Sequence, residues 1–173
     1  ILGVKKYQLT KKEKKLFKKF KPWGIILFSR NIKNITQLKS LIDEIRKLFN
    51  NKKFPIMIDQ EGGKVSRLNK ILDFSAFSQS NLKHIYKKNK KLFYSIYNIY
   101  VNEVCNIFNF VGININTTPV LDIRRKNAHH VIGSRSFSNN VDDVVKLGNI
   151  CIKLFEKKKN FNCSKTYSWT WIS

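Results

Sequence analysis

Acidic residues are scarce in this chain of 173 residues: 11 Asp and Glu stand against 34 Lys and Arg, for a formal net charge of +23. Such a charge attracts nucleic acids and anionic membranes. The lysines, however, are scattered through every segment among asparagines and isoleucines, the residues that AT-rich codons supply. They form no basic stripe with interleaved aromatics, so we expect no specific nucleic-acid partner.

Cysteines and long apolar runs are also rare. Cys105, Cys151 and Cys163 follow no metal or disulfide spacing, so we expect three reduced thiols in a cytoplasmic protein. No apolar run approaches the roughly 20 residues of a membrane span. Residues 1–20 have too little apolar length before their lysines for a secretory signal. A hydrophobic fraction of 42% nevertheless predicts a soluble globular domain.

Two short apolar runs, GIILFS at 24–29 and FPIMID at 54–59, are typical of strands buried on both faces. The segment between them predicts a helix, with Asn34 as N-cap and Gln37 three residues later. Its apolar residues recur at helical spacing: Leu38, Leu41, Ile42, Ile45 and Phe49. The three elements predict a βαβ unit with parallel strands.

The pattern then repeats. A helix is expected over about 90–110, ended by Gly112, with a face of Ile96, Ile99, Tyr100, Val104, Ile107 and Phe108. A strand follows at 115–123. The next helix begins after Asn139 or Asn140, with a buried stripe of Val144, Leu147, Cys151, Leu154 and Phe155. Three βα units stand in a row, and a fourth strand is expected next.

Successive βα units fit either a (β/α)8 barrel or a doubly wound sheet. A nucleotide-binding doubly wound fold would carry a Gly-x-Gly-x-x-Gly or P-loop motif after its first strand, whereas SRNIKN follows here. Polar side chains instead follow the strands: Arg30 and Asn31, Asp59, and Asp122. Side chains that converge at strand carboxyl ends are typical of barrel active sites. We therefore predict an α/β fold, the first half of a TIM-type (β/α)8 barrel.

The stretch IDQEGGKVSRL carries the most specific pattern. Asp59 is expected to point into the barrel mouth, Gly62 and Gly63 to allow a tight turn, and Arg67 to return to the same place. A carboxylate beside an arginine can clamp sugar hydroxyls, one group accepting and the other donating hydrogen bonds. A plain ion pair that stabilises the loop fits the spacing equally well.

Four stretches, KPWGIILFSRNI, IDQEGGKVSRL, TTPVLDI and IGSRSF, occur in the order found in glycoside hydrolase family 3. From Pro22 to Lys159 the chain resembles the single-domain β-N-acetylglucosaminidase branch of that family. The resemblance implies a cytoplasmic hydrolase of N-acetylglucosamine-containing cell-wall fragments that uses no cofactor. It assigns substrate binding to Asp59, Arg67 and Arg135.

Two departures concern the loop before Arg135. The family usually has an acid immediately before that arginine, where this chain has Ser134, so the resemblance implies that a local carboxylate–arginine pair is missing. His129 and His130 are adjacent, but they lack further Cys, His or acid partners in a metal-ligand spacing. We interpret them as loop residues and expect no metal.

The resemblance also implies a retaining mechanism, with an aspartate nucleophile and a loop histidine as general acid/base. In the family both groups follow a Lys-His-Phe/Ile-Pro-Gly-His-Gly box, which the 173 residues do not contain. No catalytic residue is therefore assigned, and we expect this chain alone to be inactive. A non-catalytic carbohydrate-binding remnant and a basic nucleic-acid or membrane-surface binder remain as alternatives.

The last residues predict an explanation for the missing box. Residues 165–172, written with AT-rich codons and shifted by one base, give Lys-His-Ile-Pro-Gly-His-Gly. We therefore expect 1–160 to be the N-terminal half of a barrel domain and 161–173 to be an out-of-frame tail, with the slip in the adenine run that encodes 157–159. The nucleotide sequence tests this: correction of one base there should open a frame through the box to a loop histidine and a later aspartate. A shifted frame that closes at once would refute it.

Overall fold

The computed structural model describes residues 1–124, 131–158 and 165–166. Within these residues five parallel strands form one sheet in chain order. The strands are short: β1 (Leu2–Gly3), β2 (Ile25–Leu27), β3 (Ile56–Ile58), β4 (Ile115–Asn116) and β5 (Lys165–Thr166). Parallel neighbours in sequential order are the strand arrangement of a (β/α) barrel, so the predicted α/β class is confirmed.

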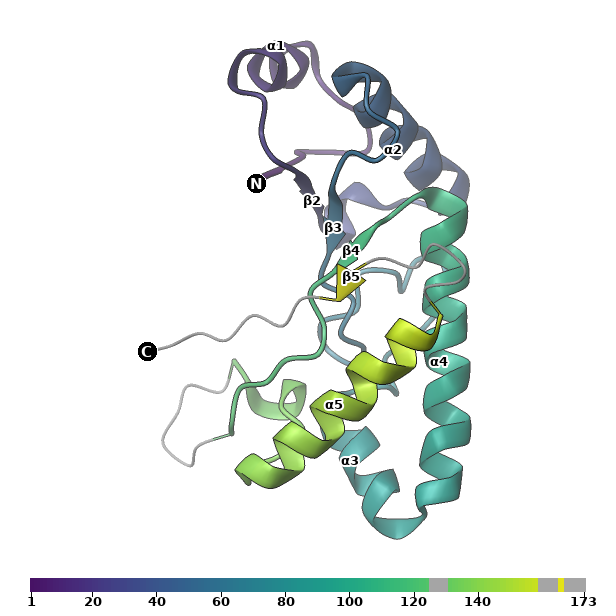
Figure 1. The fold of residues 1–173 in the computed structure, drawn as a ribbon. Coiled ribbons are helices and arrows are strands. Elements are labelled where there is room, and N and C mark those ends of the chain that lie inside the picture. Colours follow the sequence, from purple (N-terminus) through teal and green to yellow (C-terminus); the bar gives the residue numbers. More distant parts are fainter. Residues whose placement is uncertain (125–130, 159–164, 167–173) are drawn as a thin grey trace.

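Helices occupy the crossovers between the strands. They are α1 (Lys11–Phe20), α2 (Ile35–Phe49), α3 (Gln79–Lys88), α4 (Lys90–Val111) and α5 (Val141–Lys157), with short 3-10 turns η1 (Ser29–Asn31) and η2 (Gly133–Arg135). Successive helices pack on one another, α1 on α2, α2 on α4 and α4 on α5, while the strands converge beside them (Figure 1). The result is an open arc of a barrel. In the described ranges none of these helices has the length and apolar content of a membrane span.

The two most regular helices follow their predicted patterns. Asn34 caps α2 by accepting the Gln37 N–H at 2.8 Å, and the expected apolar residues up to Ile45 are buried. Phe49 is only partly buried and stacks on Phe54, with ring centroids 4.0 Å apart. For α5 the structure selects Asn140, whose side chain accepts the Asp143 N–H at 3.0 Å. Its five-residue apolar stripe is buried throughout.

Three elements were not predicted: β1, α1 and α3. Only Phe17 is buried on lysine-rich α1, so the sequence has no apolar stripe that would predict this helix. A capping box does mark its start, since Thr10 Oγ1 accepts the Glu13 N–H and Glu13 accepts the Thr10 N–H. Because β1 precedes it, the strand at 24–29 is the second of the sheet. β5 falls within 161–173, the stretch expected to be an out-of-frame tail, and that expectation stays a prediction.

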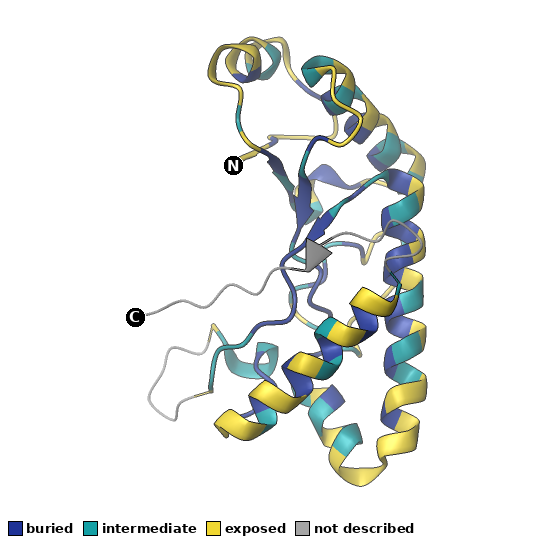
Figure 2. Cartoon of the chain, in the orientation of Figure 1, coloured by how far each residue is buried: buried dark blue, intermediate teal, exposed yellow. Residues whose placement is uncertain are grey.

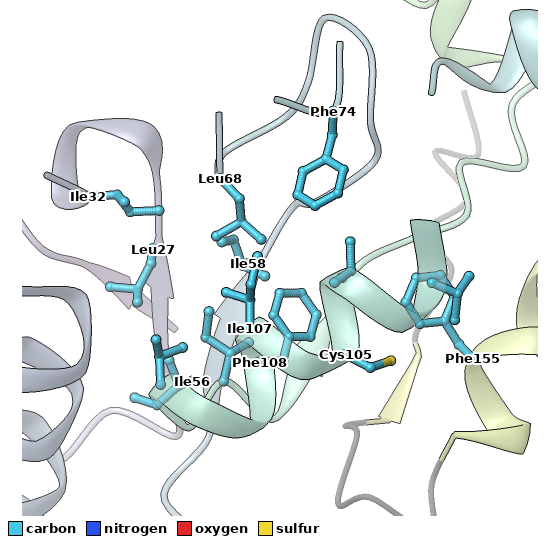
Figure 3. Packing of buried hydrophobic residues seen from close by; sticks show 14 of the residues in the cluster. Leu27, Ile32, Ile56, Ile58, Leu68, Phe74, Cys105, Ile107, Phe108 and Phe155 are labelled. Carbon is cyan, nitrogen blue, oxygen red and sulfur yellow. The ribbon is translucent and has the colours of Figure 1, made fainter. Parts of the chain in front are cut away.

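The core lies between the strands and the inner faces of the helices. Buried residues line β2, β3 and β4 and one side of each long helix, while β1 and the outward sides of the helices are exposed (Figure 2). In Figure 3 the side chains of Ile56 and Ile58 from β3 lie beside Ile107 and Phe108 from α4. One expected core residue is wrong: Ile99 is 59% exposed, because its position on α4 turns away from the sheet.

Two of the three cysteines, Cys105 and Cys151, are buried in the core. Cys151 is a free, fully buried thiol that accepts the Tyr97 hydroxyl at 2.6 Å, and burial raises its pKa to about 12. Cys105 on α4 is buried, with 2% of its surface exposed. Cys163 lies outside the described residues.

Candidate functional site

A cavity of about 660 Å³ opens at the carboxyl ends of β3 and β4. Its volume falls in the range of roughly 300–1,000 Å³ typical of small-molecule sites. Both polar and apolar side chains line it: Ile1, Ile26, Met57, Asp59, Glu61, Thr117, Val120, Asp122, Val131, Ile132 and Arg135. Two of the predicted site residues, Asp59 and Arg135, are therefore in its wall, and the third, Arg67, lies behind Asp59.

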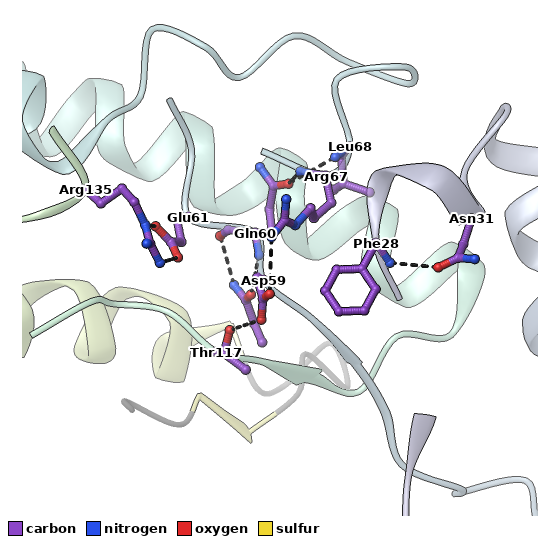
Figure 4. A network of polar contacts seen from close by, with 10 residues as sticks. Phe28, Asn31, Asp59, Gln60, Glu61, Arg67, Leu68, Thr117 and Arg135 are labelled. Atoms are coloured by element: carbon purple, nitrogen blue, oxygen red, sulfur yellow. Dashed lines mark hydrogen bonds and ion pairs between the residues drawn. The ribbon is translucent and has the colours of Figure 1, made fainter. Parts of the chain in front are cut away.

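Asp59 follows β3 directly, as expected for a residue at the barrel mouth. Its Oδ1 accepts the Thr117 hydroxyl at 2.6 Å, and its Oδ2 lies 3.4 Å from Arg67 Nη2 (Figure 4). The structure thus brings Asp59 and Arg67 together, as the spacing predicted. The long second contact is weak, which leaves Oδ2 able to accept a stronger hydrogen bond from a ligand.

Arg67 keeps unused hydrogen-bonding capacity. Its guanidinium carbon lies 5.6 Å from the centroid of the Phe28 ring, and Arg30 approaches the same ring at 4.4 Å. Arg67 Nε is buried and has no hydrogen-bond partner among the described residues. Because a guanidinium carries five N–H donors, a ligand at this place could use those that Asp59 does not. Asn31, expected at the mouth, instead has a structural role, accepting the Phe28 N–H at 2.9 Å.

Arg135 forms the strongest ion pair of the described site. It binds Glu61 with two parallel hydrogen bonds, Nε to Oε2 at 2.8 Å and Nη2 to Oε1 at 2.7 Å. The Glu61 side chain is 5% exposed. The hydrogen bond with Glu61 raises the pKa of Arg135, and the charges of Asp122 and Asp59 add to this effect. All three carboxylates line the same cavity as Arg135.

Glu61 was not predicted as a site residue. The sequence suggested that Ser134 leaves Arg135 without a local carboxylate, but the structure supplies one from 74 positions earlier in the chain. The sequence feature that could have identified Glu61 was its place as the second acid of the DQEGG stretch. Spacing gave no reason to pair it with Arg135, because the two residues meet only when the loops after β3 and β4 converge.

The double glycine makes the expected turn. Gly62 and Gly63 have φ angles of +86° and +64°, a region that L-residues with a side chain rarely occupy. A Cβ on Gly62 would lie 2.5 Å from the Phe77 carbonyl oxygen. The turn is closed by the Glu61 N–H, which donates to the Val65 carbonyl at 3.0 Å. It directs the following residues back toward Asp59.

Asp122 lines the cavity at the end of the segment after β4, as its position predicted. His129 and His130 lie outside the described residues. Over the ranges that the structure covers, no group of three or more His, Cys, Asp or Glu side chains is arranged to hold a metal ion. The absence of a metal stays a prediction.

A parallel strand arc with carboxylates and arginines gathered at its carboxyl edge has the arrangement of a (β/α)-barrel domain, the class of fold in which active sites lie at the carboxyl ends of the strands. Residues 2–167 match the model of the glycosyl hydrolase family 3 N-terminal domain. The chain belongs to this family, and the predicted resemblance is confirmed.

Similar proteins agree with this assignment. The beta-hexosaminidase of Neisseria meningitidis serogroup C is 34% identical over 166 residues, which cover 93% of this chain and 44% of that protein. The crystal structure of native NagZ from Neisseria gonorrhoeae superposes with a TM-score of 0.76 at 31% identity, covering 90% of this chain and 45% of that one. The same NagZ in complex with N-trifluoroacetyl-D-glucosamine gives a TM-score of 0.69 at 32% identity, with the same coverage. This chain spans less than half the length of the relatives it matches.

Proposed function

We propose that the cavity is the sugar-binding part of the active site of a β-N-acetylglucosaminidase-type glycoside hydrolase. The observation that carries the proposal is the joint placement of Asp59, Glu61 and Arg135 in one cavity wall, with Arg67 behind Asp59. A related protein of the same family binds N-trifluoroacetyl-D-glucosamine. An N-acetylglucosamine-containing saccharide is therefore the proposed ligand.

The side chains have complementary hydrogen-bonding roles for such a ligand. Asp59 accepts from a sugar hydroxyl through Oδ2, because Thr117 already occupies Oδ1. Arg67 donates from the N–H groups that its long contact with Asp59 leaves available. Arg135 uses Nε and Nη2 to bind Glu61, so its Nη1 is left to donate to a sugar hydroxyl. The apolar walls contributed by Met57 and Val120 suit the faces of a sugar ring.

The affinity for N-trifluoroacetyl-D-glucosamine, followed by ¹⁹F NMR, tests this proposal. Asp59→Ala and Arg67→Ala should each weaken binding, because a hydrogen bond to a charged group contributes roughly 1.5–3 kcal/mol, about 10- to 150-fold in affinity. Lys64→Ala is the matched control: it removes an exposed positive charge from the same loop and should leave binding unchanged. Equal affinity in the wild-type chain and in both site variants would refute the assignment.

The reaction itself, retaining hydrolysis of N-acetylglucosamine-containing cell-wall fragments, is part of the proposal for the whole protein. Turnover of a chromogenic N-acetylglucosaminide by a chain completed with the rest of the barrel would support it. DNA binding that is sensitive to salt and survives Asp59→Ala would favour the basic-binder alternative instead. The cytoplasmic location stays a prediction that cell fractionation would test.

A further inference from the structure

Gln60 is the most completely bonded polar side chain beside the cavity. It is fully buried, although a glutamine side chain is usually exposed. Its Oε1 accepts the backbone N–H groups of Arg67 at 2.9 Å and Leu68 at 3.1 Å. Its Nε2 donates to Ser66 Oγ at 3.0 Å. One side chain therefore binds three successive residues of the returning loop. Figure 4 shows Gln60 beside two of them, Arg67 and Leu68.

The backbone of Gln60 is held just as firmly. Asn116 Oδ1 accepts the Gln60 N–H at 3.0 Å, and its Nδ2 donates to the Gln60 carbonyl at 3.3 Å. The buried Tyr100 hydroxyl donates to the same carbonyl at 3.2 Å. Gln60 is thus fixed to β4 and α4 through its main chain. Its side chain transfers that fixed position to the loop.

The two ends of the loop are held separately. The Val65 carbonyl accepts the Glu61 N–H, and the Leu68 side chain is buried in the core. Arg67, between them, has few other contacts. Residues 66–68 belong to no helix or strand, and the Arg67 side chain has only the long 3.4 Å contact with Asp59 and the Phe28 ring face to orient it. If the backbone N–H groups of Arg67 and Leu68 were bonded to water, the Arg67 guanidinium could move away from the cavity. The carboxamide oxygen of Gln60 accepts both of these groups inside the core instead.

We propose that Gln60 is a positioning residue of the sugar site: its carboxamide, by accepting the Arg67 and Leu68 N–H groups, holds the Arg67 guanidinium beside Asp59. Part of this inference rests on the proposed function, because it makes sugar affinity depend on Gln60 through Arg67. The other part, the restraint of the loop, stands on the contacts alone.

Amide hydrogen exchange of the wild-type chain tests the restraint without any ligand. The Arg67 and Leu68 amides should exchange at least about tenfold more slowly than those of the exposed neighbours Lys64 and Asn69. Gln60→Met keeps the length of the side chain but removes its acceptor, so it should abolish this protection while the Ile58 amide in β3 stays protected. Fast exchange at Arg67 and Leu68 in the wild type would overturn the inference. Because this measurement needs only the wild-type chain, it decides the question even if Gln60→Met does not fold.

Sugar affinity tests whether Gln60 acts through Arg67. Gln60→Met should weaken N-trifluoroacetyl-D-glucosamine binding, and Gln60→Met combined with Arg67→Ala should bind no more weakly than Arg67→Ala alone. Additive losses, or wild-type affinity in Gln60→Met, would contradict the positioning role. Asn114→Ala is the control for a lost amide side chain, because the partly buried Asn114 accepts the Ile56 N–H at the opposite ends of the strands. If the wild type binds no sugar, the proposed function fails, and the exchange experiment still decides the restraint.

Discussion

Arg135→Ala should lower the free energy of unfolding of the chain by roughly 3 kcal/mol, the cost typical of removing one partner from a buried ion pair. The reason is the position of Glu61. Its side chain is 5% exposed, and both of its oxygens are bonded to Arg135. Without the guanidinium, a carboxylate is left buried and unpaired. Chemical denaturation of the variant against the wild type measures the loss.

The reverse substitution should cost less. Arg135 is 24% exposed, so in Glu61→Ala the freed guanidinium can turn toward water. Arg124→Ala, which removes an exposed arginine from the same stretch, should change stability by less than about 0.5 kcal/mol. A smaller loss for Arg135→Ala than for Glu61→Ala would contradict the burial argument, since it would place the cost on the arginine.

Gly62→Ala should destabilise the chain by more than about 2 kcal/mol. The backbone at φ +86° costs a residue with a side chain about 1–2 kcal/mol on its own. The added Cβ would also lie 2.5 Å from the Phe77 carbonyl oxygen, a backbone atom that cannot rotate away. The turn must therefore shift, and with it the loop that carries Arg67. The same denaturation measurement reports the stability change.

Gly133→Ala separates the two contributions to that effect. Gly133 also has a positive φ, +40°, but no atom of the described residues lies within 4 Å of the position its Cβ would take. This variant should show only the backbone cost, about 1–2 kcal/mol. Equal losses at the two glycines would mean that the close approach to Phe77 contributes nothing.

The sequence predicted the elements whose apolar periodicity is strong. The stripes of α2 and α5 are regular because each helix buries one face against the arc. α1 escaped detection because it buries only Phe17. The strand expected at 115–123 is shorter in the structure. The residues after β4 are buried, but their backbone groups bond to side chains and not to a neighbouring strand: Val120 makes both of its backbone hydrogen bonds with the Gln79 side chain. In a sequence, a buried extended segment and a paired strand show the same apolar pattern.

For the site, the sequence predicted what lies close along the chain. Asp59 and Arg67 are eight positions apart, within reach of one turn, and they meet. Glu61 and Arg135 are separated by 74 positions, and only the convergence of two loops pairs them. Gln60 carries no charge, so nothing in the sequence marked it as a site residue. Its role depends on two bonds to backbone N–H groups and one to the Ser66 hydroxyl, which no spacing rule describes.

The proposed function requires that a saccharide occupy the cavity at the carboxyl ends of β3 and β4. A ¹H–¹⁵N NMR titration of the chain with N-acetylglucosamine tests it most directly, because every amide reports its own surroundings. We predict saturable shifts confined to Asp59, Glu61, Thr117, Arg135 and their neighbours. In Asp59→Ala the same shifts should need a sugar concentration about 10- to 150-fold higher. Shifts that follow the exposed lysines of α1 instead, or a spectrum unchanged by the sugar, would contradict a saccharide site in this cavity.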